Sequence, residues 1–328
     1  MFLAFLRSAL GLAPLFIYGA SGETVTEKSG HLNMGIPGIM CMGMAGGMFG
    51  CALYSAFTGG NMTNINGVGL MACMLFFTIL IGALAGLLFS FFAVNLRCNQ
   101  NVIGLTLTTF GIGFYALVFT ILEKSGGFTI ARYSQYCSTV NYLFISEADC
   151  TNWAQTIFGS YGFLWYLCFF IAFGAAIFIR HTRIGLNLRA VGENAASSDA
   201  AGIDVAKYRY IATTVGATIA ALGGLYYMVE MKVGLLEFNE LDGFGWLAVA
   251  LVIFTLWQTD LCVVGAIVFA MLYKLPSFYP LPNQAANILF QYLPYLVTIV
   301  ILVLVSIFNK RNFAAPKDLG ITYFRENR

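Results

Sequence analysis

The chain has 328 residues, of which 59% are hydrophobic and only 10% are charged. A soluble domain carries roughly 25% charged residues, so this composition excludes a water-soluble globular protein. The charges are also unevenly placed, because six long stretches contain no Asp, Glu, Lys or Arg: 29–96, 98–122, 150–179, 210–229, 243–259 and 275–309. A membrane-spanning helix needs about 20 mostly apolar residues. The sequence therefore predicts a polytopic membrane protein built from helices.

Taken in chain order, the regions predicted to span the membrane are 4–20, 34–57, 68–95, 102–122, 161–179, 209–229, 244–258, 261–275 and 288–308. We expect an all-α fold with about 8–10 transmembrane helices, in a single domain over residues 1–328. The regions 244–258 and 261–275 are short, so they are also compatible with one hairpin that crosses only part of the membrane. The N-terminal region has no small-residue cleavage signature, which favours a retained first helix over a signal peptide.

Small residues recur at helix-packing intervals within the predicted spans. The pairs are Gly46 and Gly50, Gly82 and Gly86, and Gly216 and Ala220. Such pairs let helix backbones approach closely in lipid. We expect them to pack helices within one bundle rather than to mediate dimerisation.

The distribution of Lys and Arg predicts the orientation, because these residues accumulate in cytoplasmic loops. Five basic residues lie in 180–209 and five more in the tail 309–328. Four predicted spans separate these segments, so both are expected in the cytoplasm, with the N-terminus and the large loop 123–160 outside. Helical spans indicate the cytoplasmic (inner) membrane, since outer-membrane spans are usually β-strands.

Several kinds of catalytic site are absent from the sequence. There is no G-x-x-x-x-G-K-[ST] phosphate loop and no H-E-x-x-H pattern, and the two histidines are His31 and His181. We therefore expect no enzyme activity, cofactor or metal in this chain. Ion-coupled transporters generally keep ionisable groups inside the membrane, and the central parts of the predicted spans have none. A partner is expected to supply energy, although coupling to Na⁺ through backbone carbonyls leaves a self-contained secondary transporter or channel as an alternative.

The polar loop 180–208 carries the signals of a short helix. Asn194 is a good N-cap residue, and Gly202 is suited to the position just after a helix end. The Ala-rich stretch between them predicts about two turns, roughly 11 Å long. Such a helix is too small to fold alone, and it has the right size to insert into a cleft of another protein. The alternative is a solvated loop that merely carries positive charge.

The same loop carries a resemblance to a known family. Its string RIGLNLRAVGENAASSDAAGIDVAKY resembles the cytoplasmic signature of ABC-importer permeases of the branched-chain amino acid and simple-sugar superfamily. Three further strings resemble the nucleoside-type branch: KSGHLNMGI at 28–36, RCNQNVIGL at 97–105, and APKDLG at 315–320 with the ending YFRENR. The four strings occur in the same order as in the family, and the resemblance runs from about residue 6 to the C-terminus.

The resemblance implies a permease subunit of an ATP-driven importer of purine nucleosides. It implies three partners: a second homologous permease, a cytoplasmic ABC ATPase that uses ATP and Mg²⁺, and a nucleoside-binding lipoprotein, for which the loop 123–160 is the largest external surface. The coupling helix that docks on the ATPase would contain Arg189, Gly192, Glu193, Asn194, Asp199 and Gly202. A permease for simple sugars or branched-chain amino acids is the alternative within the superfamily.

An uncharged nucleoside needs a path with neutral hydrogen-bonding groups and apolar or aromatic surface. Asn33 begins the second predicted span, and Asn99 and Gln100 precede the fourth. These three residues are the candidates for the substrate pathway. The alternative is ordinary hydrogen bonding between helices, which is common in membrane bundles.

Two further features are left open by the sequence. Pro37 stands where the resembled family usually has an acidic residue, so either a substrate contact is lost or Pro37 lies at a helix entry, where proline is tolerated. We favour the helix entry. Cys137 and Cys150 share the loop 123–160 and would pair only if that loop faces an oxidising compartment.

Overall fold

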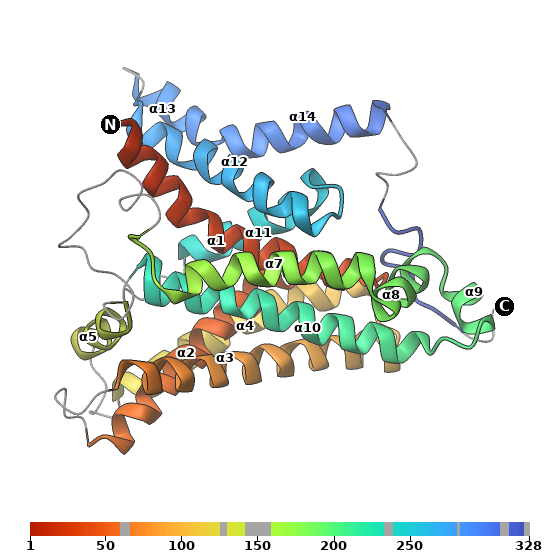
Figure 1. The fold of residues 1–328 in the computed structure, drawn as a ribbon, viewed down its shortest axis with the longest axis horizontal. Helices are drawn as coiled ribbons and strands as arrows, with labels where there is room; N and C mark the ends of the chain where they lie inside the picture. Colours follow the sequence, from red (N-terminus) through yellow and green to blue (C-terminus); the bar gives the residue numbers. More distant parts are fainter. Residues whose placement is uncertain are drawn as a thin grey trace.

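The computed structural model describes residues 1–59, 66–124, 130–141, 159–232, 239–280, 283–308 and 315–324. All regular secondary structure in these ranges is helical. The long helices run along the longest axis of the molecule, and the N-terminus and the tail residues 315–324 lie at opposite ends (Figure 1). We call these ends the N-terminal end and the C-terminal end of the bundle.

Seven helices in the described ranges are long and apolar enough to cross a membrane. They are α1 (Phe2–Glu27), α2 (Ile36–Phe57), α3 (Gly67–Ser90, continued by a π-helical turn Phe91–Asn95), α4 (Gln100–Lys124), α7 (Phe163–His181), α10 (Val205–Tyr226, continued by a π-helical turn Tyr227–Met231) and α12 (Thr259–Phe278). Two shorter helices, α11 (Asn239–Phe254) and α14 (Leu293–Phe308), have 16 residues each. Together they occupy the nine predicted regions in order, and the all-α polytopic fold is confirmed.

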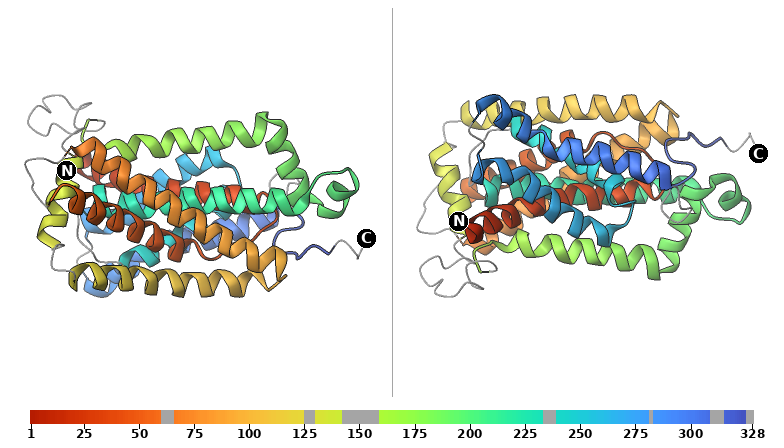
Figure 2. Two further views of the ribbon diagram at one scale, coloured as in Figure 1. Left: turned by 90° about the horizontal axis from the view of Figure 1, so that it is seen from below. Right: turned by 90° about the horizontal axis from the view of Figure 1, so that it is seen from above.

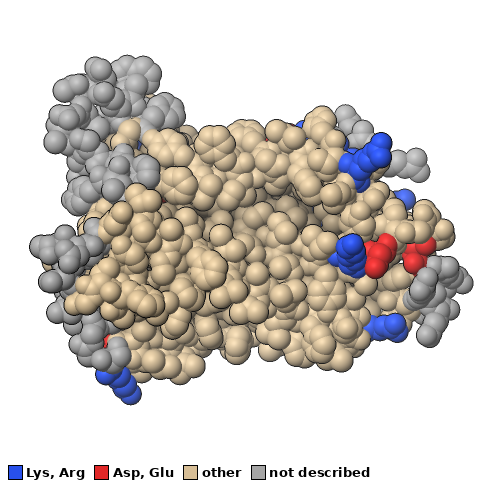
Figure 3. Space-filling view, turned by 60° about the horizontal axis from the view of Figure 1, so that its bottom comes forward, with Lys and Arg blue, Asp and Glu red and all other residues tan. Residues whose placement is uncertain are grey.

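Four short helices lie at the two ends of this bundle. The N-terminal end carries α5 (Ile130–Asn141) and α13 (Gln284–Gln291), and the C-terminal end carries α8 (Arg183–Glu193) and α9 (Ala195–Ala200) (Figures 1 and 2). On the face shown in Figure 3, charged side chains lie at the ends and the long middle zone shows none. This zone matches the apolar belt of a membrane protein.

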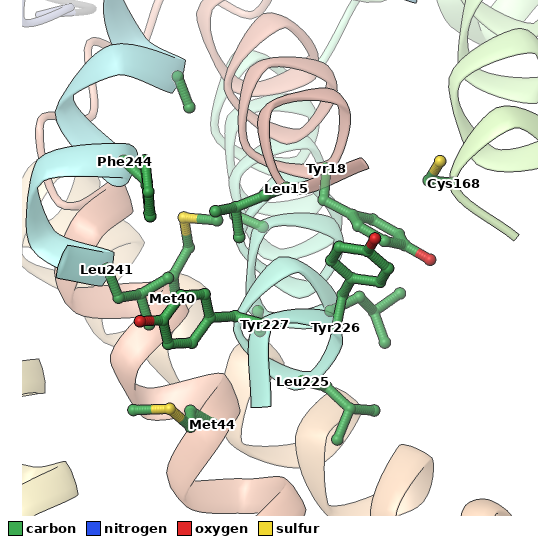
Figure 4. Close-up of a cluster of buried hydrophobic side chains, with 14 of the residues drawn as sticks. Leu15, Tyr18, Met40, Met44, Cys168, Leu225, Tyr226, Tyr227, Leu241 and Phe244 are labelled. Atoms are coloured by element: carbon green, nitrogen blue, oxygen red, sulfur yellow. The ribbon is translucent and has the colours of Figure 1, made fainter. Parts of the chain in front are cut away.

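The centre of the bundle is formed by α1, α2 and α10, which bury most of their residues. Aromatic and sulfur-containing side chains from these helices and from α7 and α11 meet in one cluster (Figure 4). Tyr18 of α1 is fully buried there, and its hydroxyl donates a 2.8 Å hydrogen bond to the Leu164 carbonyl of α7. Large apolar side chains of the outer helices remain exposed, as lipid contact requires; examples are Phe76, Leu84, Leu117 and Phe170.

The structure corrects the end of the first span. The prediction placed it at residue 20, whereas α1 continues to Glu27 and carries two buried carboxyl groups, Glu23 and Glu27, into the bundle. The helix can continue because both groups find donors: Trp257 Nε1 donates to Glu27, and the Asn33 N–H donates to Glu23 Oε1. The apolar stretch of the sequence predicted a span here. It could not show that polar partners allow the helix to extend beyond residue 20.

The regions predicted at 244–258 and 261–275 form α11 and α12, which are joined by a short turn and both pack against α1. The turn between them contains two consecutive residues with positive φ, Leu256 at 55° and Trp257 at 56°. Positive φ is costly for residues with a bulky side chain. The hydrogen bond from Trp257 to Glu27 fixes this turn against α1.

The small-residue pairs act within the bundle, as expected. A Cβ atom added at Gly46 would lie 2.8 Å from the Phe77 carbonyl oxygen of α3. One added at Gly86 would lie 2.7 Å from the Cα atom of Thr214 in α10. Side chains larger than hydrogen are excluded at these crossings, so the internal packing role is confirmed.

We predict that Gly216→Ala destabilises the bundle. The added methyl group would lie 2.2 Å from Thr26 Oγ1 and 2.4 Å from the Gly22 carbonyl oxygen, so α1 and α10 must separate. Overpacking of this kind costs about 1–3 kcal/mol, and the midpoint of thermal unfolding in detergent should fall. The control is Gly174→Ala on α7, whose added methyl group meets no atom within 4 Å. Equal midpoints for the two variants would contradict the close crossing.

Candidate functional site

The predicted short helix is present as α9, and a second helix, α8, precedes it. Thr182 Oγ1 accepts a 3.0 Å hydrogen bond from the Gly185 N–H and caps α8. Asn194 Oδ1 accepts a 2.8 Å bond from the Ser197 N–H and caps α9, as predicted. Gly202 follows the C-cap with φ of 84°, the left-handed conformation that glycine allows at a helix end.

The six predicted coupling residues divide into two groups by burial. Glu193, Asn194 and Gly202 are exposed at the C-terminal end of the bundle, where a partner can reach them. Gly192 is buried, Arg189 and Asp199 are partly buried, and these three face the rest of the chain. A Cβ atom at Gly192 would lie 2.3 Å from the Lys28 carbonyl oxygen, so α8 contacts the connection between α1 and α2 directly.

That connection, residues 28–35, is largely buried although it is not helical. The N–H groups of residues 28–30 donate to backbone carbonyls of α1, and three further N–H groups donate to side chains. The Leu32 N–H donates to Gln100 Oε1 at 2.8 Å, the Asn33 N–H to Glu23 Oε1 at 3.0 Å, and the Gly35 N–H to Asn33 Oδ1 at 2.9 Å. Buried backbone that is not helical is tolerated only when its N–H and C=O groups have such hydrogen-bond partners.

His31 fastens the same connection to α10. Its side chain is fully buried, and Nδ1 lies 2.8 Å from Thr213 Oγ1. Burial, and then the positive charge of Arg209, lower the pKa of His31 well below its usual range. The imidazole is therefore neutral near pH 7, and its hydrogen bond to Thr213 links the connection to α10.

The structure brings two of the three pathway candidates together. Asn33 within the 28–35 connection and Gln100 beside it are both buried, and the amide nitrogens Asn33 Nδ2 and Gln100 Nε2 have no hydrogen-bond partner among the described residues. Asn99 is exposed and caps the start of α4, where its Oδ1 accepts a 3.0 Å bond from the Asn101 N–H. A substrate-pathway role for the three residues stays a prediction.

Pro37 is the second residue of α2 and lies in its first turn, two residues after the N-cap Gly35. Proline suits this position because its missing N–H would have no helical partner there. The helix-entry interpretation is confirmed.

Cys150 of the 123–160 loop lies outside the described residues, so the pairing of Cys137 with Cys150 stays open. Tyr136 of that loop is buried, and its hydroxyl lies 2.7 Å from Ser55 Oγ.

A hollow of 660 Å³ opens at the N-terminal end of the bundle, between α1, α7, α10, α11 and α12. Its lining combines aromatic rings with polar groups, among them Tyr161, Tyr226, Phe244, Tyr273, Ser8 and Glu230. Glu230 Oε1 accepts a 2.7 Å hydrogen bond from the Leu164 N–H in the first turn of α7. None of the three pathway candidates lines this hollow.

Several residues that organise the C-terminal end are not among the predicted site residues. Glu23 holds the connection, Arg209 is buried at 3% exposure, and Asp318 and Tyr323 bring the tail against α9. The Glu23 and Glu27 spacing of four residues just before KSGHLNMGI was the signal for one inward helix face. In the part of the chain that the structure describes, no group of three His, Cys, Asp or Glu residues is placed to hold a metal.

Comparison with known proteins gives a consistent picture. Residues 5–306 match the family described as branched-chain amino acid transport system / permease component. The nucleoside ABC transporter permease protein NupC of Lactococcus lactis is 26% identical, with 94% of this chain and 93% of the relative covered. The guanosine ABC transporter permease protein NupQ of Bacillus subtilis is 25% identical, with 96% and 94% covered. TsgC13 of Haloferax volcanii, named provisionally for glucose ABC transport, is 27% identical, with 81% and 75% covered.

We predict that Gln100→Leu destabilises the connection. The apolar side chain leaves the Leu32 N–H without its acceptor, and an unsatisfied buried donor costs about 1–3 kcal/mol. The thermal midpoint of the purified protein should fall accordingly. Asn101→Leu replaces the neighbouring amide, which is exposed, and serves as the control. A midpoint for Gln100→Leu equal to that of the control would refute the assigned role.

Proposed function

The chain belongs to the permease-component family of branched-chain amino acid transport systems, and from this premise we propose that it serves an ATP-driven importer of purine nucleosides. In this proposal the chain forms the translocation path and hydrolyses no ATP. A separate ABC ATPase uses ATP and Mg²⁺, and a second homologous permease and a nucleoside-binding lipoprotein complete the importer. The observation that carries the proposal is the α8–α9 unit, which is exposed at the C-terminal end and contacts the connection between α1 and α2 through its buried side.

The α8–α9 unit has the properties of a docking element. Glu193, Asn194, Ser197 and Ala200 present polar and small side chains at the surface, while Val191 and Ala195 pack beneath them with Val205 of α10. Arg189, Gly192, Glu193, Asn194, Asp199 and Gly202 form this element in the proposal. ATP-driven movement of the ATPase would displace α9 and, through Gly192, the 28–35 connection.

The orientation in this proposal places the C-terminal end in the cytoplasm. Basic residues of the described chain gather there: Arg97, Arg180, Arg183, Arg189, Lys207 and Lys317. Arg180 also pairs with Asp260 at 2.7 Å across the base of α7 and α12. The N-terminal end, with α5 and the loop 123–160, then faces the outside, where the loaded lipoprotein would dock.

The substrate assignment has two supports. NupC and NupQ are relatives over nearly the whole chain and carry nucleoside and guanosine in their names. The hollow at the proposed outer end is lined by Tyr161, Tyr226 and Tyr273, by hydroxyl groups, and also by the charged side chains Arg7, Glu230, Lys232 and Lys274. Its aromatic rings and hydroxyl groups suit a flat base and a sugar. TsgC13 supports a simple sugar as the second candidate.

We predict that Glu193→Arg uncouples the importer. Glu193 is exposed on the docking face, and reversing its charge opposes any basic group of the ATPase that faces it. Membrane insertion and ATP hydrolysis should continue, while ATP-driven uptake in vesicles should fall by more than about tenfold. Glu193→Gln keeps the size without the reversed charge and should lose less uptake. Wild-type uptake by Glu193→Arg would refute the docking assignment.

Substrate competition tests the proposal that the importer takes up purine nucleosides. Uptake of a labelled purine nucleoside by the complete importer should be blocked by an excess of another purine nucleoside, and ribose or leucine should not block it. Binding to the partner lipoprotein should follow the same order. Competition by ribose would favour the sugar alternative. Uptake by this chain alone in liposomes, without ATP, would instead indicate a secondary transporter.

A further inference from the structure

The tail segment, residues 315–324, returns to the bundle after α14 and lies across the C-terminal end (Figure 1). Its ten residues touch parts of the chain that are far apart in sequence. The Gly320 N–H donates to the Gly30 carbonyl at 3.0 Å, and Arg209 Nη1 of α10 donates to the Ile321 carbonyl at 3.2 Å. The tail segment is therefore attached to both the 28–35 connection and α10.

Asp318 holds the bend between α8 and α9 from both sides. Its backbone N–H donates to the Gly192 carbonyl at 3.0 Å, at the end of α8. Its carboxylate Oδ2 accepts a 2.7 Å hydrogen bond from the Ala195 N–H, at the start of α9. The carboxylate thus adds to the cap that Asn194 provides, and a negative charge at a helix start is favourable.

Two aromatic residues fix the far end of the tail segment. The Tyr323 hydroxyl donates a 2.8 Å hydrogen bond to Asp199 Oδ2, near the end of α9, and the ring packs against Val191, Ala195 and Val205. Phe324 lies beneath the Arg97 guanidinium, 4.8 Å from its centre, which attaches the tail to the turn between α3 and α4. Both ends of α9 are thereby held by one segment.

We propose that the tail segment is a working part of the coupling device, with Asp318 as its positioning residue. It fixes the angle between α8 and α9 and carries a displacement of α9 to the 28–35 connection and to α10. A six-residue helix has little stability of its own. Without the tail segment, α9 would deform when a docked partner moves, and the movement would not reach the spans.

Asp318→Ala tests this inference, which rests on the proposed ATP-driven function, in the complete importer reconstituted in liposomes. Loss of the cap should speed amide hydrogen exchange in 194–201 by about tenfold. The amount of substrate taken up per ATP hydrolysed should fall. Tyr323→Phe removes only the bond to Asp199 and should lower the same ratio less. Lys317→Ala, at the neighbouring exposed side chain, should match the unaltered importer in both measurements.

The outcomes separate coupling from simple stability. An Asp318→Ala importer that assembles in smaller amounts but keeps its uptake-to-ATP ratio would overturn the proposal and leave the tail a structural role only. An unchanged exchange rate in 194–201 would overturn the cap itself. If the unaltered importer takes up no nucleoside, the proposed substrate fails, and the ratio is measured with ribose or leucine, whichever is transported.

Discussion

The arrangement of the C-terminal end depends on the need to satisfy a buried, irregular backbone without water. The 28–35 connection joins two long helices inside the bundle, and it can be buried only because Glu23, Asn33 and Gln100 accept its N–H groups. Each of these bonds has a fixed partner on α1, on α4 or within the connection. These hydrogen bonds therefore hold the ends of α1, α2 and α4 together as one unit. The α8–α9 element contacts this unit through Gly192.

The same requirement explains where this protein places its polar groups. In the middle of the bundle the helices satisfy their own backbones, so small residues and aromatic rings suffice for packing. At the C-terminal end, helices stop and turns begin, and buried polar side chains such as Glu23, Glu27, His31 and Arg209 gather there. The scarcity of charge in the sequence thus marks the membrane zone, and these few buried ionisable side chains mark the joints between helices at the C-terminal end.

The sequence predicted the features that depend on local pattern. The nine apolar regions, the Asn194 cap, the Gly202 helix end and the Pro37 helix entry each follow from a few neighbouring residues, and each is found. It missed what depends on distant partners. Glu23 and Glu27 are polar and were assigned to a loop, yet Asn33 and Trp257 make them part of a helix. Asp318 is 123 residues from Ala195 along the chain, and no local signal connects the two.

The contacts of α1 and α10 show how an event at one end can be felt at the other. These helices meet without side chains between them at Gly22 and Gly216, and Tyr226 of α10 donates a hydrogen bond to the Gly11 carbonyl of α1 near the opposite end. Closely packed helices move as bodies rather than deform. The two are held at the C-terminal end by Gly30 and Arg209, and they line the 660 Å³ hollow at the N-terminal end. A shift of the 28–35 connection that moved α1 and α10 relative to α11 and α12 would therefore change the shape of that hollow.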